Sequence, residues 1–162
     1  MTNFDRAFTD LIGNEGGYSN NPADPGGETM WGVTLAVARE NGYMGAMRDL
    51  PQETAKAIYR KKYWLSQFDQ LAYGLAFQLF DGAVNSGVGQ SVRWLQRALG
   101  EVDDGKFGPV TLASALKADP VKTAMLFNAK RLMFMTQLTG WASFGKGWAR
   151  RIAENLERGC SV

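Results

Sequence analysis

The sequence predicts a mainly α-helical protein with one irregular, glycine-rich segment near its beginning. Apolar residues recur three and four positions apart along most of the 162 residues, and no segment shows the period-two alternation of a convincing strand. Residues 13–32 hold six glycines and two prolines, turn signals that leave room for at most a short hairpin. At this length, folding buries roughly 68–70% of the chain's surface, enough for one core or two small cores that share a wall.

The expected helices follow from these apolar patterns and from the residues that begin and end helices. They cover residues 3–12, 34–40, 51–63, 71–86, 90–99, 110–116, 120–135 and 144–156. Asn3 and Thr34 are the expected caps of the first two helices, and Pro51 is the expected first residue of the third. Gly100 ends the fifth helix, and Asp119, followed by a proline, begins the seventh.

The helix from residue 120 shows an apolar face, which we expect to pack into the core. This face comprises Val121, Met125, Ala129, Leu132 and Met135. Basic residues in the second half of the chain are interpreted as exposed helix surface or, alternatively, as a surface for anionic wall polymers or lipid headgroups. They are Arg93, Arg97, Lys130, Arg131, Lys146, Arg150 and Arg151.

The composition excludes several kinds of chemistry. Histidine is absent, which excludes Ser-His-Asp and Cys-His triads and histidine-ligated zinc. A single cysteine excludes disulfides within the chain and thiolate metal clusters. Catalysis must therefore use carboxylates, hydroxyls, amides and backbone groups, and we expect no metal and no cofactor.

Charge and targeting signals restrict the expected partners. The net charge is only +2, and no clustered basic motif indicates nucleic-acid binding. The first ten residues contain no apolar signal-peptide core, and no apolar run approaches the roughly 18 residues of a membrane span. We expect a protein made in the cytoplasm, without stable membrane insertion.

Two carboxyl groups of the glycine-rich segment are candidates for acid catalysis. Glu15 directly follows a helix whose apolar face points to the core, so burial would raise the pKa of its carboxyl and keep it protonated. Asp24 stands in an open, polar turn and would remain ionised. Two carboxyls with separated pKa values are the minimum equipment for glycoside hydrolysis, although Asp24 before a proline is also an ordinary turn residue.

Three runs in this region resemble a known enzyme family. They are Asn14-Glu15-Gly16-Gly17-Tyr18-Ser19-Asn20, Asp24-Pro25-Gly26-Gly27-Glu28-Thr29 and Trp31-Gly32-Val33-Thr34. Together they are similar to the signature of the glycoside hydrolase 108 muramidases, which are phage endolysins and related bacterial lysozymes. The run from Leu79 to Gly87 is similar to the end of that family's catalytic region. Residues 94–99 and 104–111 resemble the peptidoglycan-associated segment that usually follows, so the resemblance covers about residues 5–158.

The resemblance implies a lysozyme-like helical fold, one body with two lobes, and assigns activity to the first. Residues 1–88 would form the muramidase lobe and residues 89–162 a helical peptidoglycan-associated lobe. The implied reaction is hydrolysis of the β-1,4 bond between N-acetylmuramic acid and N-acetylglucosamine, with Glu15 as general acid. Asp24 and Thr29 are similar to the carboxylate and hydroxyl of phage-type lysozymes, with Thr34 as an alternative hydroxyl. Whether the reaction inverts or retains stays open.

Other residues in or near these motifs have two possible roles each. Tyr18 and Trp31 either stack on sugar rings or pack the loop onto the core. Asp81 and Asn85, four positions apart on one helical face, either line a substrate cleft or form a buried pair that holds the loop.

Two rival functions remain, and each has a distinguishing mark. A lytic transglycosylase cuts the same bond without water, and a non-catalytic peptidoglycan-binding module would usually have lost the glutamate that is present here as Glu15. The muramidase is the interpretation we adopt. We expect a monomer that acts on the wall in the periplasm or outside, an endolysin-type enzyme that reaches it through a holin-type pore.

Overall fold

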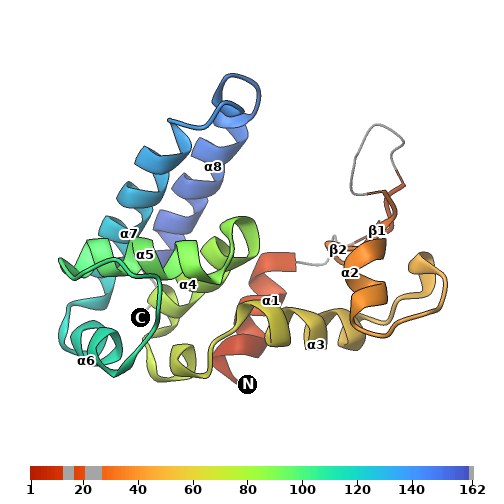
Figure 1. Ribbon diagram of the computed structural model, residues 1–162, viewed down its shortest axis with the longest axis horizontal. Helices are drawn as coiled ribbons and strands as arrows, with labels where there is room; N and C mark the ends of the chain where they lie inside the picture. Colours follow the sequence, from red (N-terminus) through yellow and green to blue (C-terminus); the bar gives the residue numbers. More distant parts are fainter. Residues whose placement is uncertain (13–16, 21–26, 161–162) are drawn as a thin grey trace. The chain divides into compact units, whose positions relative to one another are not determined.

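The computed structural model describes residues 1–12, 17–20 and 27–160, and it is 71% helical (Figure 1). The mainly α, lysozyme-like fold class predicted from the sequence is therefore confirmed. In these described ranges, the strands form one antiparallel pair of two residues each, which agrees with the expectation of at most a short hairpin.

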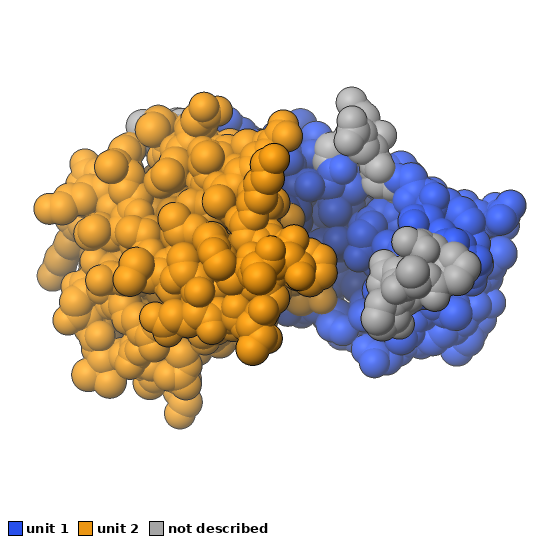
Figure 2. Space-filling model, turned by 90° about the horizontal axis from the view of Figure 1, so that it is seen from above, with its two compact units in different colours: residues 1–62 blue, residues 63–162 orange. Residues whose placement is uncertain are grey.

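The chain divides into two compact units, residues 1–62 and 63–162, which Figure 2 shows in different colours. This division lies before residue 88. Helix α4 (Tyr73–Ser86), which ends before that residue, and α5 (Val88–Leu99), which begins at it, pack against each other within the second unit. The assignment of a muramidase lobe to residues 1–88 and of a wall-associated lobe to the remainder stays a prediction.

The first unit contains short elements around a small aromatic core. Its elements are α1 (Asn3–Ile12), β1 (Thr29–Met30), β2 (Val33–Thr34), α2 (Leu35–Glu40), the 3₁₀ helix η1 (Met47–Asp49) and α3 (Gln52–Tyr63), whose last residue belongs to the second unit. Phe8 of α1 meets Tyr59 of α3 edge to face, with ring centroids 5.5 Å apart. The Lys56 ammonium of α3 contacts the Asp5 carboxylate of α1 at 2.7 Å.

The start of α1 differs from the expectation, because Thr2 caps it instead of Asn3. The Asp5 N–H donates to Thr2 Oγ1 at 3.2 Å, and the Thr2 N–H donates to Asp5 Oδ2 at 3.0 Å. Such a reciprocal pair satisfies two backbone donors at once, which a lone asparagine cap cannot do. The other expected caps are confirmed: Thr34 accepts from the Val37 N–H, and Asp119 accepts from the Lys122 N–H.

The second unit is a helical cluster built around α4. Its elements are η2 (Ser66–Gln70), α4 (Tyr73–Ser86), α5 (Val88–Leu99), α6 (Pro109–Lys117), α7 (Pro120–Met135) and α8 (Trp141–Gly159). Helices α5, α7 and α8 all pack against α4, and its residues from Tyr73 to Ala83 are buried. Gly82 permits the close approach of α5, since a Cβ there would lie 2.8 Å from Ser91 Oγ.

The buried face of α7 is not the apolar face that the sequence predicted. The buried residues are Thr123, Ala124, Phe127, Asn128, Arg131 and Met135, so that of the predicted face only Met135 is buried. Arg131, expected on the surface, is fully buried. The reason is that α4 presents polar side chains to α7: Asn128 Nδ2 donates to Gln78 Oε1 at 3.0 Å, and Arg131 binds Asp81.

Candidate active site

Two of the predicted catalytic residues, Glu15 and Asp24, lie outside the described residues. The described part of the region comprises residues 17–20 and 27–34, together with the elements of the first unit that contact them. These segments flank both predicted carboxyl residues in the sequence. They define how Thr29, Thr34, Tyr18 and Trp31 are held.

The hairpin β1–β2 is the centre of this frame. Thr29 pairs with Thr34 and Met30 pairs with Val33 in antiparallel register. Its two-residue turn consists of Trp31 at φ 53° and Gly32 at φ 71°. Positive φ at both central residues gives the turn the twist that a two-residue hairpin requires. The hairpin therefore fixes the backbone conformation of the motif Trp31-Gly32-Val33-Thr34.

A third segment, residues 17–20, joins the hairpin. The Ser19 N–H donates to the Thr29 carbonyl and the Thr29 N–H donates to the Ser19 carbonyl, both at 2.8 Å. Two reciprocal backbone bonds hold Ser19 and Thr29 directly opposite each other. Ser19 and Thr29, which precede and follow Asp24 in the sequence, are thus held opposite each other.

Trp31 is an anchor of the hairpin, which favours the packing interpretation over sugar stacking. Its Nε1–H donates to the Leu50 carbonyl at 2.9 Å, and its side chain is only partly exposed. A bulky residue in the left-handed region costs roughly 1–2 kcal/mol. The hydrogen bond to Leu50 offsets part of this cost and fixes the orientation of the indole.

Gly32 allows the backbone to approach α3 closely. A Cβ at this position would lie 2.4 Å from Tyr59 Oη, closer than non-bonded atoms tolerate, and its positive φ already disfavours any other residue. The glycine in Trp31-Gly32-Val33-Thr34 therefore has a physical reason: it lets the turn rest on Tyr59.

Tyr18 takes part in a polar contact that the sequence did not reveal. Its hydroxyl donates to Glu28 Oε1 at 2.5 Å, and the Arg48 guanidinium lies 4.8 Å from the centre of its ring. Glu28 was visible as one more carboxyl in the glycine-rich segment, but no sequence signal linked it to Tyr18. Arg48 lies 30 residues further along the chain, so its contact is decided by tertiary structure alone.

The two hydroxyls that the sequence left as alternatives are close neighbours. Thr29 and Thr34 are register partners, and directly opposite residues of an antiparallel pair share one face of the ribbon. The Thr34 hydroxyl accepts from the Val37 N–H at 3.4 Å and caps α2, whereas the Thr29 hydroxyl donates to the Gly27 carbonyl at 3.3 Å. Thr34 therefore has a structural task of its own.

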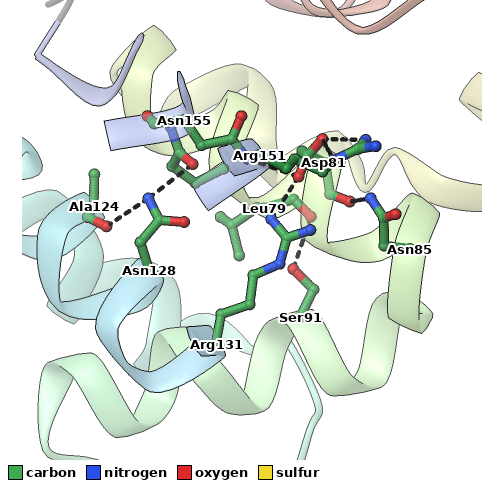
Figure 3. Close-up of polar contacts among 10 residues, drawn as sticks. Leu79, Asp81, Asn85, Ser91, Ala124, Asn128, Arg131, Arg151 and Asn155 are labelled. Atoms are coloured by element: carbon green, nitrogen blue, oxygen red, sulfur yellow. Dashed lines mark hydrogen bonds and ion pairs between the residues drawn. The ribbon is translucent and has the colours of Figure 1, made fainter. Parts of the chain in front are cut away.

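Asp81 and Asn85 lie in the second unit, where Asp81 is buried (Figure 3). Arg131 Nη1 and Asn155 Nδ2 donate to Asp81 Oδ2 at 2.5 and 2.7 Å. Arg151 Nε and Nη2 donate to Oδ1 at 2.9 and 2.5 Å. Asn85 Nδ2 donates to the backbone carbonyl of Asp81 at 2.7 Å. The expected buried pair that holds the glycine-rich loop is therefore wrong for these residues: Asp81 is buried but its described side-chain partners belong to α7 and α8, and Asn85 is exposed.

The ionisation of Asp81 is set by its surroundings. Burial by itself would raise the pKa of the carboxyl, but the charges of Arg131 and Arg151 and their hydrogen bonds outweigh it and hold the pKa below its ordinary value. Burial lowers the pKa of Arg131, and the Asp81 carboxylate opposes this effect. The single carboxylate of Asp81 thus compensates part of the positive charge of two guanidinium groups where α4, α7 and α8 pack together.

Among the described residues, no three acidic, histidine or cysteine side chains are grouped as metal ligands. Nor does the described part of the chain contain a helix long and apolar enough to cross a membrane.

Comparison with known proteins identifies the class. Residues 8–87 match the family model described as glycosyl hydrolase 108. The structure of SagA from Brucella abortus is similar to the whole chain, with 32% sequence identity, a TM-score of 0.83, and coverage of 96% of this chain and 92% of that one. No curated protein sequence matches.

A mainly helical chain with these motifs and these similarities is a glycoside hydrolase of the muramidase type, which acts on peptidoglycan. The chain belongs to the glycoside hydrolase 108 family.

Proposed function

We propose that the protein is an N-acetylmuramidase that hydrolyses the β-1,4 bond between N-acetylmuramic acid and N-acetylglucosamine, with Glu15 as its general acid. The observation that carries this proposal is membership of the glycoside hydrolase 108 family, since residues 8–87, which match the family model, include the motif of Glu15. The composition supports it as well, because glycoside hydrolysis needs no histidine and no thiol.

In the proposed cycle, Glu15 protonates the oxygen of the leaving sugar while positive charge develops on the muramic acid ring. Asp24 stabilises that charge or, together with the Thr29 hydroxyl, orients the attacking water. The two backbone hydrogen bonds between Ser19 and Thr29 support this role for Thr29, because they hold it opposite a residue that lies five positions before Asp24 in the sequence. Thr34 already caps α2, so Thr29 is the better candidate of the two hydroxyls.

The deciding experiment is mass spectrometry of purified peptidoglycan after digestion with the wild type and with Glu15→Gln. The amide keeps the volume of the side chain and removes its acidic proton. A general acid contributes roughly 10²–10⁴-fold to rate, so the variant should release at least about a hundredfold less product. Glu53→Gln, at an exposed position of α3, is the matched control and should digest normally.

The products separate the proposal from its rivals. Muropeptides that end in reducing N-acetylmuramic acid are expected. Products lighter by one water would make the enzyme a lytic transglycosylase, and wall binding without any product would make it a binding module. The anomer released first tells whether the reaction inverts, which requires carboxyls about 6.5–9.5 Å apart, or retains, which requires about 5–5.5 Å.

We also propose an endolysin-type setting, in which a monomer made in a host cytoplasm reaches the wall through a holin-type pore. The resemblance of the motif around Glu15 to the motifs of phage endolysins supports this setting. Expression in a bacterial cytoplasm should be tolerated until a pore is opened and should then lyse the cells. Lysis without any pore would refute this route.

A further inference from the structure

The outer face of α7 is an apolar surface that no described element covers. Its exposed residues are Lys122, Met125, Leu126, Ala129, Lys130 and Met133, which we call the α7 face. Met125 is 56%, Leu126 38% and Met133 62% exposed. Met125 and Ala129 belong to the stripe that the sequence predicted as core, so an apolar pattern at helical spacing is turned to solvent.

The exposure of the α7 face follows from the packing of the opposite face. Thr123, Phe127, Asn128 and Arg131 face the interior of the unit, where α4, α5 and α8 pack against α7. Asn128 and Arg131 of that inner face have partners in α4, which fixes the rotation of the helix. The α7 face cannot turn inward without exposing the charge of Arg131.

Charge distinguishes this surface from an ordinary apolar patch. Residues 120–153 contain no aspartate or glutamate but six cations, Lys122, Lys130, Arg131, Lys146, Arg150 and Arg151. Arg131 and Arg151 bind Asp81, and Arg150 binds Glu154. Within the described ranges, Lys122, Lys130 and Lys146 form no ion pair, and two of them lie on the α7 face. The surface therefore combines exposed apolar side chains with uncompensated positive charge.

The turn that follows α7 and the start of α8 also expose apolar side chains. Figure 1 shows α7 and α8 side by side, joined by the turn between Met135 and Trp141. Leu138 in this turn and Phe144 in the first turns of α8 are exposed, and Phe144 packs beside the partly exposed Trp148, with ring centroids 6.0 Å apart. Aromatic rings among cations are typical of residues that lie at the level of lipid headgroups.

We propose that the α7 face docks the protein on the surface of an anionic lipid membrane, lying on the bilayer without crossing it. Methionine and leucine side chains enter the boundary between headgroups and acyl chains, and Lys122 and Lys130 pair with lipid phosphates. A second copy of the chain fits less well, because the α7 face has no carboxylate to meet the lysines of a partner. A polysaccharide fits less well because the exposed side chains of the α7 face between its lysines are aliphatic and offer a sugar no hydrogen-bonding group.

The test measures co-sedimentation of the full chain with vesicles of phosphatidylglycerol and phosphatidylethanolamine, and with vesicles of phosphatidylcholine alone. Two variants address the two parts of the surface: Met125→Ser with Met133→Ser, and Lys122→Gln with Lys130→Gln. The control is Met44→Ser with Lys61→Gln, an exposed methionine and an exposed lysine of the first unit. Thermal melting and digestion of purified peptidoglycan check that each variant is folded.

Binding to the anionic vesicles is expected, with weak binding to phosphatidylcholine and a decrease as salt rises. Each test variant should bind roughly tenfold or more weakly, while the control should bind like the wild type. Equal vesicle binding by all variants would overturn the proposal. So would a dimer in solution that the methionine variant dissociates, or binding to wall polymer that the lysine variant loses while vesicles bind nothing. None of these outcomes depends on whether Glu15 is the catalytic acid.

Discussion

Replacing Asp81 by asparagine tests the buried ion network of the second unit. The side chain volume hardly changes, but the negative charge is lost, and one of the two acceptor oxygens becomes a donor. In the wild type, Oδ1 of Asp81 accepts two hydrogen bonds from Arg151, and Oδ2 accepts one from Arg131 and one from Asn155. In Asp81→Asn at least one guanidinium therefore faces an amide N–H₂.

The expected loss of stability is large because Arg131 is fully buried and Asp81 is its only described ionic partner. Leaving a buried charge without its partner costs roughly 3–5 kcal/mol. For a chain of 162 residues, each kcal/mol shifts the melting temperature by about 2–4 °C. The variant should therefore melt at least about 6 °C below the wild type.

Thermal unfolding followed by circular dichroism measures this effect, with Glu154→Gln as the control. The Arg150–Glu154 pair is solvent-exposed, and such pairs contribute less than about 1 kcal/mol. Adding Arg131→Met to Asp81→Asn should restore part of the lost stability, since the uncompensated charge is then gone. A melting temperature lowered by less than about 4 °C in Asp81→Asn, or no recovery in the double variant, would refute the reasoning.

Two further predictions concern acid and the hairpin. The pKa values of Asp81 and Asp5 are both depressed in the folded protein, Asp81 by its arginines against the effect of burial and Asp5 by hydrogen bonds from Lys56 and Thr2. The unfolded chain then binds more protons in acid than the folded protein. The free energy of unfolding should therefore be constant above about pH 5 and fall as the pH drops below about 4. Urea unfolding measures this, and a midpoint that rises from about pH 5 to about pH 3 would contradict it. Gly32→Ala should destabilise the first unit by more than about 1 kcal/mol and lower the rate of wall digestion, because its Cβ would collide with Tyr59 Oη. Gly147→Ala, where a Cβ meets nothing within 4 Å, is its control, and equal melting and digestion by both variants would show that the close approach is not required.

Local signals predicted most helices, because caps and helix breakers act within a few residues. Thr34 and Asp119 cap the helices that the sequence placed after them, and Gly100 ends α5 in the left-handed conformation. At the start of α1, Thr2 and Asn3 are both good caps, and the carboxyl of Asp5 three residues after Thr2 decided in favour of Thr2.

The candidate site was predictable only as a set of motifs. The sequence indicated Glu15 and Asp24 through their chemistry and the family resemblance, and Thr29 through the resemblance alone. It allowed at most a short hairpin within residues 13–32, whereas the second strand of the hairpin is Val33–Thr34. It could not indicate the contacts of Tyr18 with Glu28 and Arg48 or of Trp31 with Leu50, because these join residues 10 to 30 positions apart through the folding of the first unit.

By itself, the sequence determined that this protein is mainly helical and that its motifs are those of glycoside hydrolase 108, and it excluded chemistry that needs histidine. Only the tertiary structure decided which side of α7 faces inward. Periodicity favoured the apolar stripe at Met125 and Ala129, but Gln78 and Asp81 on α4 select Asn128 and Arg131 instead. Leaving a buried carboxylate without cationic and amide partners costs more free energy than leaving two or three methionines exposed. Asn128 and Arg131 lie 50 residues from Gln78 and Asp81 in the chain, so local sequence patterns could not reveal these contacts.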